Sequence, residues 1–450
     1  MLPSTIQRAR IRIEDALRYS RTAWNASGWL HAARAAMART DGARLERLCA
    51  AIQRADTPAL ERFTRDRLAP WLDSAEAASI WARERVGWDR YREPVGRDPA
   101  LTRTVVLKAP GPAGEKGLIA MLFEYNWLRL FGGIPDFHEL DREYDFLLCT
   151  SWSPTNHAML GLALARTTGP VFVQVCNFAE AARITRFHPR LRVVPELLGC
   201  DWIDPDAHSP RPFAERDIDF LMVANWAPFK RHWQFFEALA RMPRDLNVTL
   251  VGQPEAGHTS DDIRRLARLF GVRQELDLRE RRPLAEVMEL QARAKVALIF
   301  TRREGCCVAA VEALFAGAAL GLLKGAHVGP TAYVNPTTGR LLAPPALDQQ
   351  LMQLRDAAAI MDPRGWAVAN ISCVQSHARL NACVREATLA LHRPWTTDLA
   401  MPCWRPYPRL RHHIDHARLR PVYADLHTRW PTVFPAGLAE AAAPEGPPLR

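Results

Sequence analysis

The sequence lacks a long hydrophobic run. Its longest weakly apolar stretch, ALFAGAALGLL at 313–323, directly follows Glu312 and is far shorter than the roughly 18 to 20 residues that span a bilayer. The first ten residues, MLPSTIQRAR, contain no apolar segment of the kind that a secretory signal requires. We therefore expect no membrane-spanning segment and no cleaved secretory signal, and we expect a cytoplasmic protein.

The cysteines lack a metal-binding or redox pattern. The nine cysteines are scattered and odd in number, and no C-x-x-C pair is present. We expect reduced thiols and no bound metal. His412, His413 and His416 do lie within one helical turn, in RLRHHIDHARLR at 409–420. We interpret that segment as a basic solvated face, which is a candidate for peripheral contact with a membrane lipid or for contact with an anionic acceptor.

The charge favours an anionic partner without naming one. Lys and Arg number 59 against 49 Asp and Glu, which gives a net charge of +10. No RNA-binding aromatic motif, zinc finger or helix-turn-helix is recognisable, so we do not expect a nucleic acid partner. The 450 residues are 48% hydrophobic and 24% charged, as in ordinary globular proteins.

The chain is predicted to contain four stretches. Residues 1–100 have apolar residues at helical spacing and form a helical extension, for which we expect a packing or docking role. Residues 101–210 and 211–370 each alternate short apolar runs with helical segments, which predicts strands buried on both faces of a parallel sheet. Residues 371–450 form C-terminal helices and a tail. The fold class is therefore α/β, with two Rossmann-like, doubly wound domains and the helical extension.

The predicted strands are TRTVVLK (102–108), YDFLLCTS (144–151), GPVFVQVCN (169–177), RLRVVPE (190–196), DFLMVAN (219–225), NVTLVGQ (247–253), VALIFT (296–301) and ALGLLK (319–324). Such sheets bind ligands outside the carboxyl ends of their strands, so we expect the site in the cleft between the two domains.

The segment 299–323 carries the most informative chemistry. A strand passes through a short turn into a helix, with Glu304 at the turn and Glu312 inside the helix. The backbone N–H groups of the turn and first helical residues are expected to bind a phosphate, with the helix dipole in support. These residues are Gly305, Cys306, Cys307 and Val308. Glu312 would accept hydrogen bonds from a ribose, and Glu304 would face the group beyond the phosphates. Alternatively, Glu304 is solvated and Glu312 only caps or forms a salt bridge.

A second candidate, at Lys230 and Arg231, stands at the first turn of a helix predicted near 230–242. Cations there oppose the helix dipole, so an anion such as a diphosphate should compensate them. The alternative is a solvated basic turn.

These features together resemble the C-terminal half of the GT-B glycosyltransferases, specifically the retaining family 4. The resemblance is carried by Glu304-x7-Glu312 with the following Ala-Leu-x-x-Gly, by Ala224 to Lys230, by VTLVGQP, and by NPTTGRLLAP at 335–344. It implies transfer of a sugar, with retention, from a UDP- or GDP-sugar to a glycan, lipid-linked or small-molecule acceptor, without a cofactor or metal. Lys230 would contact the diphosphate, Glu312 the ribose and Glu304 the donor sugar.

The sequence also departs from that pattern. Asn225 stands where an arginine is frequent, so Arg231 is a candidate to supply the missing charge. Cys307 replaces a common glycine, and Cys176 with Asn177 stand where a histidine is usual. These departures leave open a non-catalytic GT-B protein that binds a glycan or nucleotide sugar, or a nucleotide-sugar epimerase.

The acceptor side is predicted from loops of the first domain. GPAGEKGLI (111–119) is expected to open a helix and to present Lys116 from a flexible loop. It is not a P-loop, because Gly rather than Ser or Thr follows Lys116. Trp152 and His157 in SWSPTNHAML, together with Asn177, are further candidates. A simple helix cap at Ser153 is the alternative for that segment.

Overall fold

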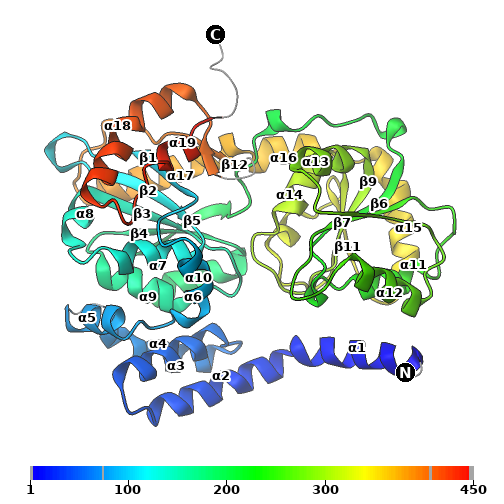
Figure 1. The fold of residues 1–450 in the computed structure, drawn as a ribbon, viewed down its shortest axis with the longest axis horizontal. Coiled ribbons are helices and arrows are strands. Elements are labelled where there is room, and N and C mark those ends of the chain that lie inside the picture. The colour runs from blue at the N-terminus through cyan, green and yellow to red at the C-terminus, as the bar shows by residue number, and fades with distance from the viewer. Residues whose placement is uncertain (1–3, 73–74, 405–407, 445–450) are drawn as a thin grey trace. The chain divides into compact units, whose positions relative to one another are not determined.

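Figure 1 shows a computed structural model of the chain, which describes residues 4–72, 75–404 and 408–444. The fold is α/β with two Rossmann-like domains, as predicted from the sequence. The chain divides into two compact units, one formed by 1–20 with 203–372 and the other by 21–202 with 373–450. We call these the six-stranded unit and the five-stranded unit. The predicted helical extension therefore contributes to both.

The six-stranded unit contains an entirely parallel sheet in the order β11-β10-β9-β6-β7-β8. Counted along the chain within this unit, the order is 3-2-1-4-5-6, that of the dinucleotide-binding Rossmann fold. The strands are β6 (Ile218–Val223), β7 (Val248–Gly252), β8 (Leu276–Glu280), β9 (Ala294–Ile299), β10 (Ala319–Leu323) and β11 (Gly339–Leu342). The order reverses between β6 and β9, which are neighbours in the sheet.

Two of these strands, β8 and β11, were not predicted from the sequence. They are the outermost strands of the sheet. Residues of β8 are mostly half-buried and read LDLRE, in which one charged residue separates the leucines and two follow them. An edge strand carries no continuous apolar run, because only part of its surface is covered. The run-based prediction therefore found the central strands alone.

Aromatic residues fill the core of this unit. Phe220 of β6, Phe235 of α11 and Phe300 are all fully buried, and the Phe235 ring lies 6.2 Å from that of Phe220 and 5.8 Å from that of Phe300. The helices of this unit are α1 (Ser4–Arg18), α11 (His232–Leu239), α12 (Ser260–Phe270), α13 (Leu284–Arg293), α14 (Val308–Phe315), α15 (Leu347–Ala357) and α16 (Pro363–Ile371).

The five-stranded unit contains a sheet in the simple order β1-β2-β3-β4-β5, without a reversal among its described strands. These strands are β1 (Thr104–Lys108), β2 (Gly117–Leu122), β3 (Tyr144–Cys149), β4 (Val171–Val175) and β5 (Leu191–Leu198). β1 and β2 are antiparallel and the other neighbours are parallel. The prediction that GPAGEKGLI opens a helix is wrong, because GLIAML forms β2, in which every residue is buried.

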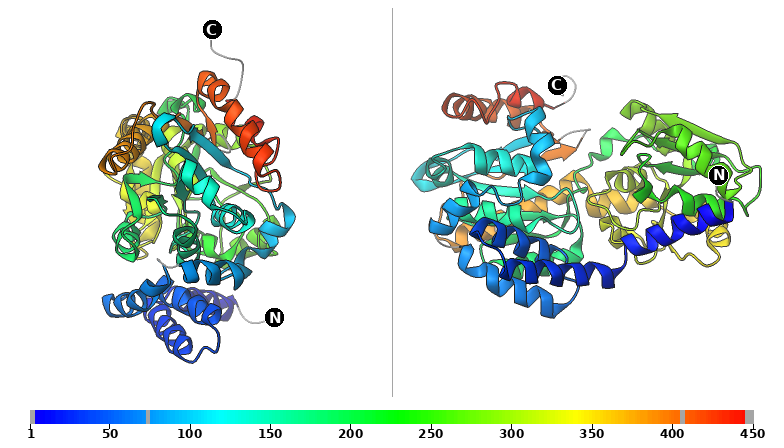
Figure 2. Two further views of the ribbon diagram at one scale, coloured as in Figure 1. Left: turned by 90° about the vertical axis from the view of Figure 1, so that its left-hand side faces the viewer. Right: turned by 60° about the horizontal axis from the view of Figure 1, so that its bottom comes forward.

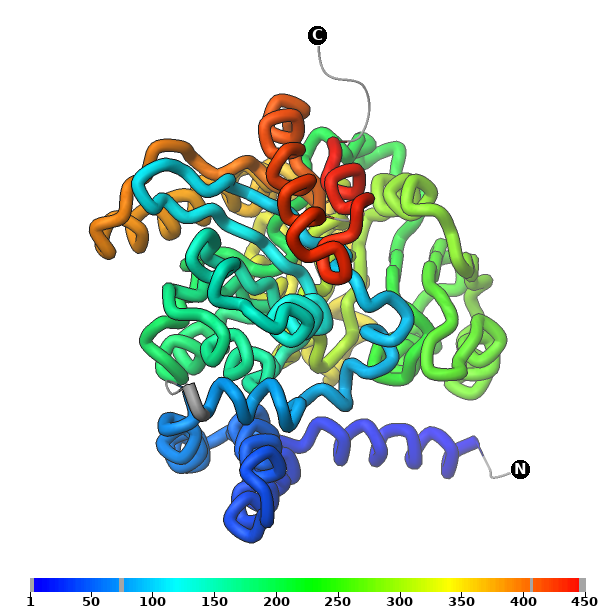
Figure 3. Tube along the Cα trace, turned by 60° about the vertical axis from the view of Figure 1, so that its left-hand side comes forward, coloured from blue at the N-terminus to red at the C-terminus, as the bar shows by residue number. Residues whose placement is uncertain are grey.

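Helices cover both faces of this sheet (Figures 1 and 3). Parallel strands in sequential order place their right-handed crossovers on one face, here α7, α9 and α10. The C-terminal α17 and α18 cover the other, packing against β5 and β1. The bounds are α6 (Arg92–Arg97), α7 (Glu124–Gly133), α8 (His138–Glu143), α9 (His157–Arg166), α10 (Ala181–Phe187), α17 (Cys373–Ala390), α18 (His413–Arg429), α19 (Leu438–Ala441), β12 (Pro402–Trp404) and β13 (Pro408–Leu410).

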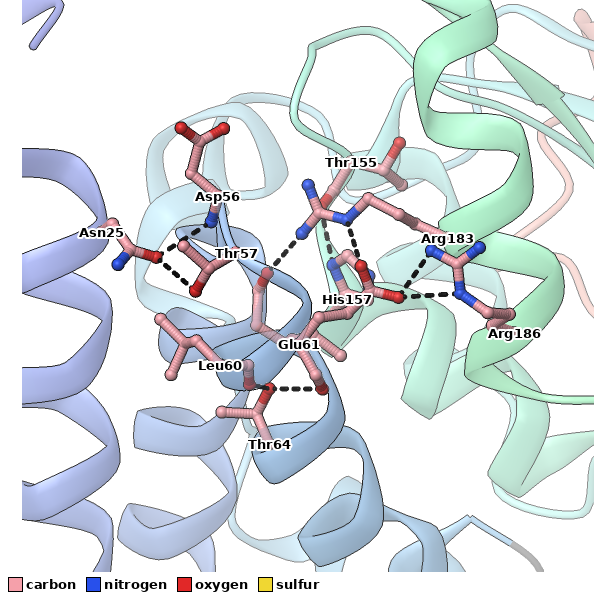
Figure 4. Close-up of polar contacts among 11 residues, drawn as sticks. Asn25, Asp56, Thr57, Leu60, Glu61, Thr64, Thr155, His157, Arg183 and Arg186 are labelled. Carbon is pink, nitrogen blue, oxygen red and sulfur yellow. Dashed lines mark hydrogen bonds and ion pairs between the residues drawn. The ribbon is translucent and has the colours of Figure 1, made fainter. Parts of the chain in front are cut away.

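Most of the helical extension packs on this unit (Figure 2). It forms α2 (Arg21–Ala36), α3 (Asp41–Gln53), α4 (Pro58–Leu68) and α5 (Ala75–Arg83). Glu61 of α4 accepts hydrogen bonds from Arg186 of α10 at 3.0 and 2.8 Å, and Arg183 donates to the Ile52 carbonyl at 2.7 Å (Figure 4). These contacts tie the extension to the helix that follows β4.

Candidate active site

The strand order of the six-stranded unit marks one edge as the candidate site. Where the order reverses, the loops that leave neighbouring strands turn to opposite faces of the sheet and open a crevice at the carboxyl ends. Here the two loops are 224–231, after β6, and 300–307, after β9. They contain Lys230 and Glu304, the two residues for which the sequence predicted a catalytic role.

A buried tryptophan anchors the loop after β6. Trp226 is 1% exposed, and its indole N–H donates to Glu280 at 2.8 Å. The Asn225 side chain accepts a hydrogen bond from the Ala227 N–H at 3.4 Å. It therefore stabilises the conformation of the loop. A turn of 3-10 helix at Pro228–Lys230 follows, and Arg231 precedes α11 with a left-handed backbone, φ 59° and ψ 38°. The loop is thus a fixed turn that ends in two consecutive cations.

The loop after β9 leads into α14 through a second left-handed residue. Cys307 caps α14 with φ 42° and ψ 56°, a conformation that glycine adopts most readily. No carbonyl or side chain of the described residues accepts a hydrogen bond from the N–H of Gly305, Cys307 or Val308. Those three donors stand at the positive end of the helix dipole, as expected for an anion site.

Lys230 and Glu304 form an ion pair between the two loops. Their side chains are only 11% and 14% exposed, so the pair is little screened by water. The other carboxylate oxygen of Glu304 is buried and accepts no hydrogen bond from the described residues. Burial and the nearby Glu304 carboxylate raise the pKa of the Cys307 thiol. Cys307 is therefore a neutral thiol, and Lys230 contacts the loop that carries the three N–H donors through Glu304.

Glu312 lies about one turn inside α14 and does not join the ion pair. Its Oε2 is 3.5 Å from the Gln291 side-chain amide, at the limit of a hydrogen bond. Burial raises the pKa of Glu312, because a desolvated carboxylate is disfavoured. A poorly solvated carboxyl group with one weak partner is able to accept further hydrogen bonds from a ligand.

Arg231 does not join the Lys230–Glu304 pair. Its guanidinium binds the Asp15 carboxylate of α1 through two hydrogen bonds, of 2.9 and 2.8 Å. Sequence reasoning did not suggest this partner, since nothing in the spacing relates two residues that lie 216 positions apart.

The acceptor-side candidates of the five-stranded unit do not share one edge. Lys116 precedes β2, so it lies at the amino end of that strand, where it pairs with Asp145 at 3.6 Å and donates to the Asp141 carbonyl. Trp152 and Asn177 follow the carboxyl ends of β3 and β4. Lys116 therefore lies at the edge of the sheet opposite to Trp152 and Asn177, because GLIAML is a strand and not a helix.

His157, expected on the acceptor side, lies in the core of the five-stranded unit. It is 3% exposed and packs edge-on against Phe187 at 5.0 Å, and burial lowers its pKa to about 4. It is the first residue of α9, whose N-cap is Asn156 and not Ser153. The Ser153 hydroxyl donates instead to Glu180 at 2.6 Å. His157 is thus a neutral core residue and is not offered to a ligand.

Sequence reasoning missed Glu124. It follows β2 at the carboxyl edge that Trp152 and Asn177 share, and it is 1% exposed. It accepts hydrogen bonds from the Ser151 hydroxyl and from the Ser151 N–H, the latter at 3.2 Å. Burial raises the pKa of Glu124. Recognising GLIAML as a strand would have pointed to this carboxyl group.

Comparison with known families agrees with the chemistry of the six-stranded unit. Residues 204–354 match the family described as glycosyl transferases group 1. The matched segment is about a third of the chain and contains Lys230, Glu304 and Glu312. The match supports a glycosyltransferase.

Solved structures with a similar fold include sucrose-phosphate synthase from Thermosynechococcus elongatus, with 14% identity, a TM-score of 0.47, and coverage of 72% of this chain and 80% of the other. Anabaena Alr3699/HepE in complex with UDP has 14% identity, a TM-score of 0.46, and coverage of 59% and 78%. The lipopolysaccharide outer core galactosyltransferase WaaB has 12% identity, a TM-score of 0.45, and coverage of 69% and 80%. No curated protein matches the chain. Among the described residues, none of the helices is both long and apolar enough to cross a membrane.

Proposed function

We propose that the chain is a family 4 glycosyltransferase that transfers a sugar from a UDP- or GDP-sugar, with retention, to a glycan, lipid-linked or small-molecule acceptor. The observation that carries the proposal is the Lys230–Glu304 ion pair at the reversal of strand order, beside the unpaired N–H groups of Gly305, Cys307 and Val308. The family match over 204–354 supports it.

The donor is held by complementary charge. The N–H groups at the start of α14, with Cys306 in the same turn, bind one phosphate, and the Lys230 ammonium leaves Glu304 to bind the diphosphate. Glu304 is then released to accept hydrogen bonds from the hydroxyls of the donor sugar. Glu312 accepts hydrogen bonds from the ribose. Asn225 and Arg231 shape the loop around the diphosphate.

The reaction needs stabilisation of charge more than acid or base chemistry. As the bond between sugar and phosphate breaks, negative charge grows on the departing diphosphate, and Lys230 and the N–H donors are already aimed at it. Preorganised donors of this kind typically contribute about 10² to 10³ in rate each. The acceptor hydroxyl attacks from the face that the diphosphate leaves, and a phosphate oxygen takes its proton. Lys230 supplies the countercharge, so no metal is required.

The acceptor is assigned to the carboxyl edge of the five-stranded sheet. Trp152 offers an aromatic surface for a sugar ring, Asn177 offers an amide, and Glu124 offers a buried carboxyl group. The exposed histidine that caps α18, His412, belongs to a basic segment that would contact an anionic lipid if the acceptor is lipid-linked.

The test is turnover of UDP- and GDP-sugars, with transfer and donor hydrolysis both scored, in the wild type and in Lys230→Ala. Lys295→Ala is the matched control, because Lys295 pairs with Asp219 at 2.9 Å at the amino ends of the same two strands. We expect Lys230→Ala to lose about 10² to 10³ in rate and Lys295→Ala to keep it. Equal rates in both variants would refute the site.

A second function, binding of a nucleotide sugar without transfer, is favoured by one observation. Asn225 brings no positive charge, and the charge of Arg231 is neutralised by Asp15, so of these loop residues only Lys230 meets the diphosphate, and it must first leave Glu304. Tight binding of UDP or GDP by the wild type, with neither transfer nor hydrolysis of any donor, would establish the binder. A new nucleotide sugar formed without any acceptor would establish an epimerase.

A further inference from the structure

Helix α1 docks on the six-stranded unit through one continuous face. Arg8 donates from Nε to the Leu269 carbonyl at 2.7 Å, and Ile11 packs against the hydrophobic core. Arg12 forms an ion pair with Glu237 of α11. These residues recur every three or four positions, which is the spacing of one helix face. α1 is therefore an integral part of this unit, although the helices that follow it belong to the other.

The same face ends at Asp15, which binds Arg231. Both carboxylate oxygens accept a hydrogen bond from the guanidinium, and the two side chains are 9% and 10% exposed. Two-point pairing of this kind fixes the orientation of both groups. Removal of one partner leaves a buried charge uncompensated. Among the described residues, Asp15 is the only carboxylate that forms an ion pair with Arg231. The buried charge of Arg231 therefore depends on Asp15.

Arg231 occupies a backbone conformation that needs outside support. A residue other than glycine rarely adopts positive φ, and it persists there only when its surroundings hold it. Arg231 directly follows Lys230, whose ammonium contacts Glu304. Because consecutive Cα atoms are about 3.8 Å apart, any shift of Arg231 also displaces Lys230. The two successive cations are therefore fixed by two acids from different elements.

We infer that Asp15 is a positioning residue of the donor site. It holds Arg231 in its left-handed conformation and thereby keeps the Lys230 ammonium at the point where a diphosphate binds. The inference rests on the proposed function and deepens it, since it makes α1 a working part of nucleoside diphosphate binding. Arg231 then acts through the backbone of the loop and does not touch the phosphates.

A competing role for Asp15 predicts a change in nucleotide affinity of the opposite sign. If Asp15 were a competing anion that occupied a phosphate-binding arginine, its removal would free Arg231 and tighten nucleotide binding. If Asp15 positions the loop, its removal weakens binding. The direction of the change in affinity for a nucleoside diphosphate therefore decides between the two.

The experiment is titration calorimetry of the full chain with UDP and with GDP. Asp15→Asn removes the charge with little change of shape. Glu14→Gln is the matched control, because Glu14 makes an equivalent charge pair with Arg10 of the same helix at 2.6 Å but is 60% exposed. We expect Asp15→Asn to weaken the preferred nucleotide by about tenfold or more, and Glu14→Gln to stay within about twofold of the wild type.

Unchanged or tighter binding by Asp15→Asn would overturn the inference and leave the proposed function intact. Absence of binding of either nucleotide by the wild type would overturn both. If Asp15→Asn does not fold, as judged by circular dichroism, the reversed pair Asp15→Arg with Arg231→Asp replaces it. The reversed pair is expected to bind within about fivefold of the wild type. A folded reversed pair that has lost binding would show that Arg231 contacts the phosphates itself, and would also overturn the inference.

Discussion

Arg231 and Cys307 both adopt left-handed backbone conformations, with φ of 59° and 42°, and each caps the helix that leaves the candidate site. The two residues end the two loops between which Lys230 and Glu304 meet. Neither is a glycine, so each conformation must be maintained by its contacts. Both loops that provide the ion pair and the unpaired N–H groups thus carry a strained backbone residue.

The strain at Cys307 predicts an inverted order of stability for two variants. Cys307→Ala and Cys307→Gly both remove the thiol, but only glycine adopts positive φ without a steric penalty. We expect Cys307→Gly to be more stable than Cys307→Ala by about 1 kcal/mol, measured by urea unfolding. The matched pair at an unstrained position, Cys383→Gly and Cys383→Ala in α17, should show the usual preference for alanine. The same preference at Cys307 would contradict the strain.

Glu312 predicts a dependence of stability on pH. Burial raises its pKa in the folded protein, so the folded state holds the proton more tightly than the unfolded chain does. Stability is therefore lost as pH rises from the ordinary glutamate value through the raised one. Glu312→Gln, which is always neutral, should melt about 2 to 4 °C above the wild type at pH 7.5.

Below the ordinary pKa of glutamate, the two proteins should melt together. The control is Glu215→Gln, at an exposed position of the same unit, for which we expect no change at either pH. If Glu312→Gln melts below the wild type at pH 7.5, the ionised carboxylate is stabilising and the assignment of a desolvated group is wrong.

His157 predicts sensitivity to mild acid. Burial lowers its pKa to about 4, against about 6.5 in an unfolded chain. Its contribution to stability is present above pH 6.5 and is lost as pH falls toward 4, because the unfolded chain takes up the proton first. Between pH 7 and pH 5 the wild type should therefore lose about 2 kcal/mol more unfolding free energy than His157→Gln.

Urea titrations at the two pH values measure this difference. His138→Gln replaces an exposed histidine and should leave the pH dependence of the wild type unaltered. Identical losses for the wild type and His157→Gln would mean that His157 is solvated, and would restore it as a candidate for ligand binding.

Much of the fold was predictable because the sequences of buried parallel strands are unbroken apolar runs. VALIFT and DFLMVAN revealed the two central strands of the six-stranded unit, and the residues after each gave Lys230 and Glu304. Their contact was not predictable, because it depends on β6 and β9 being neighbours although 74 residues separate the two side chains. The sequence states which elements exist, whereas strand order decides which loops meet.

The errors have physical causes as well. GLIAML was expected in a helix, since a run of six apolar residues satisfies either periodicity. That error moved Lys116 to the wrong edge and hid Glu124. His157 was expected near a ligand because a titratable histidine close to Trp152 suits sugar binding. Its burial depends on Phe187 of α10, and no local sequence pattern relates the two residues.

The most direct measurement is a crystal structure of the protein with UDP or GDP bound. The account predicts the diphosphate within hydrogen-bonding distance of the Lys230 ammonium and of the N–H groups of Gly305 and Val308, with the ribose hydroxyls on Glu312 and the Lys230–Glu304 contact broken. A nucleotide seated elsewhere, with the ion pair intact, would contradict it.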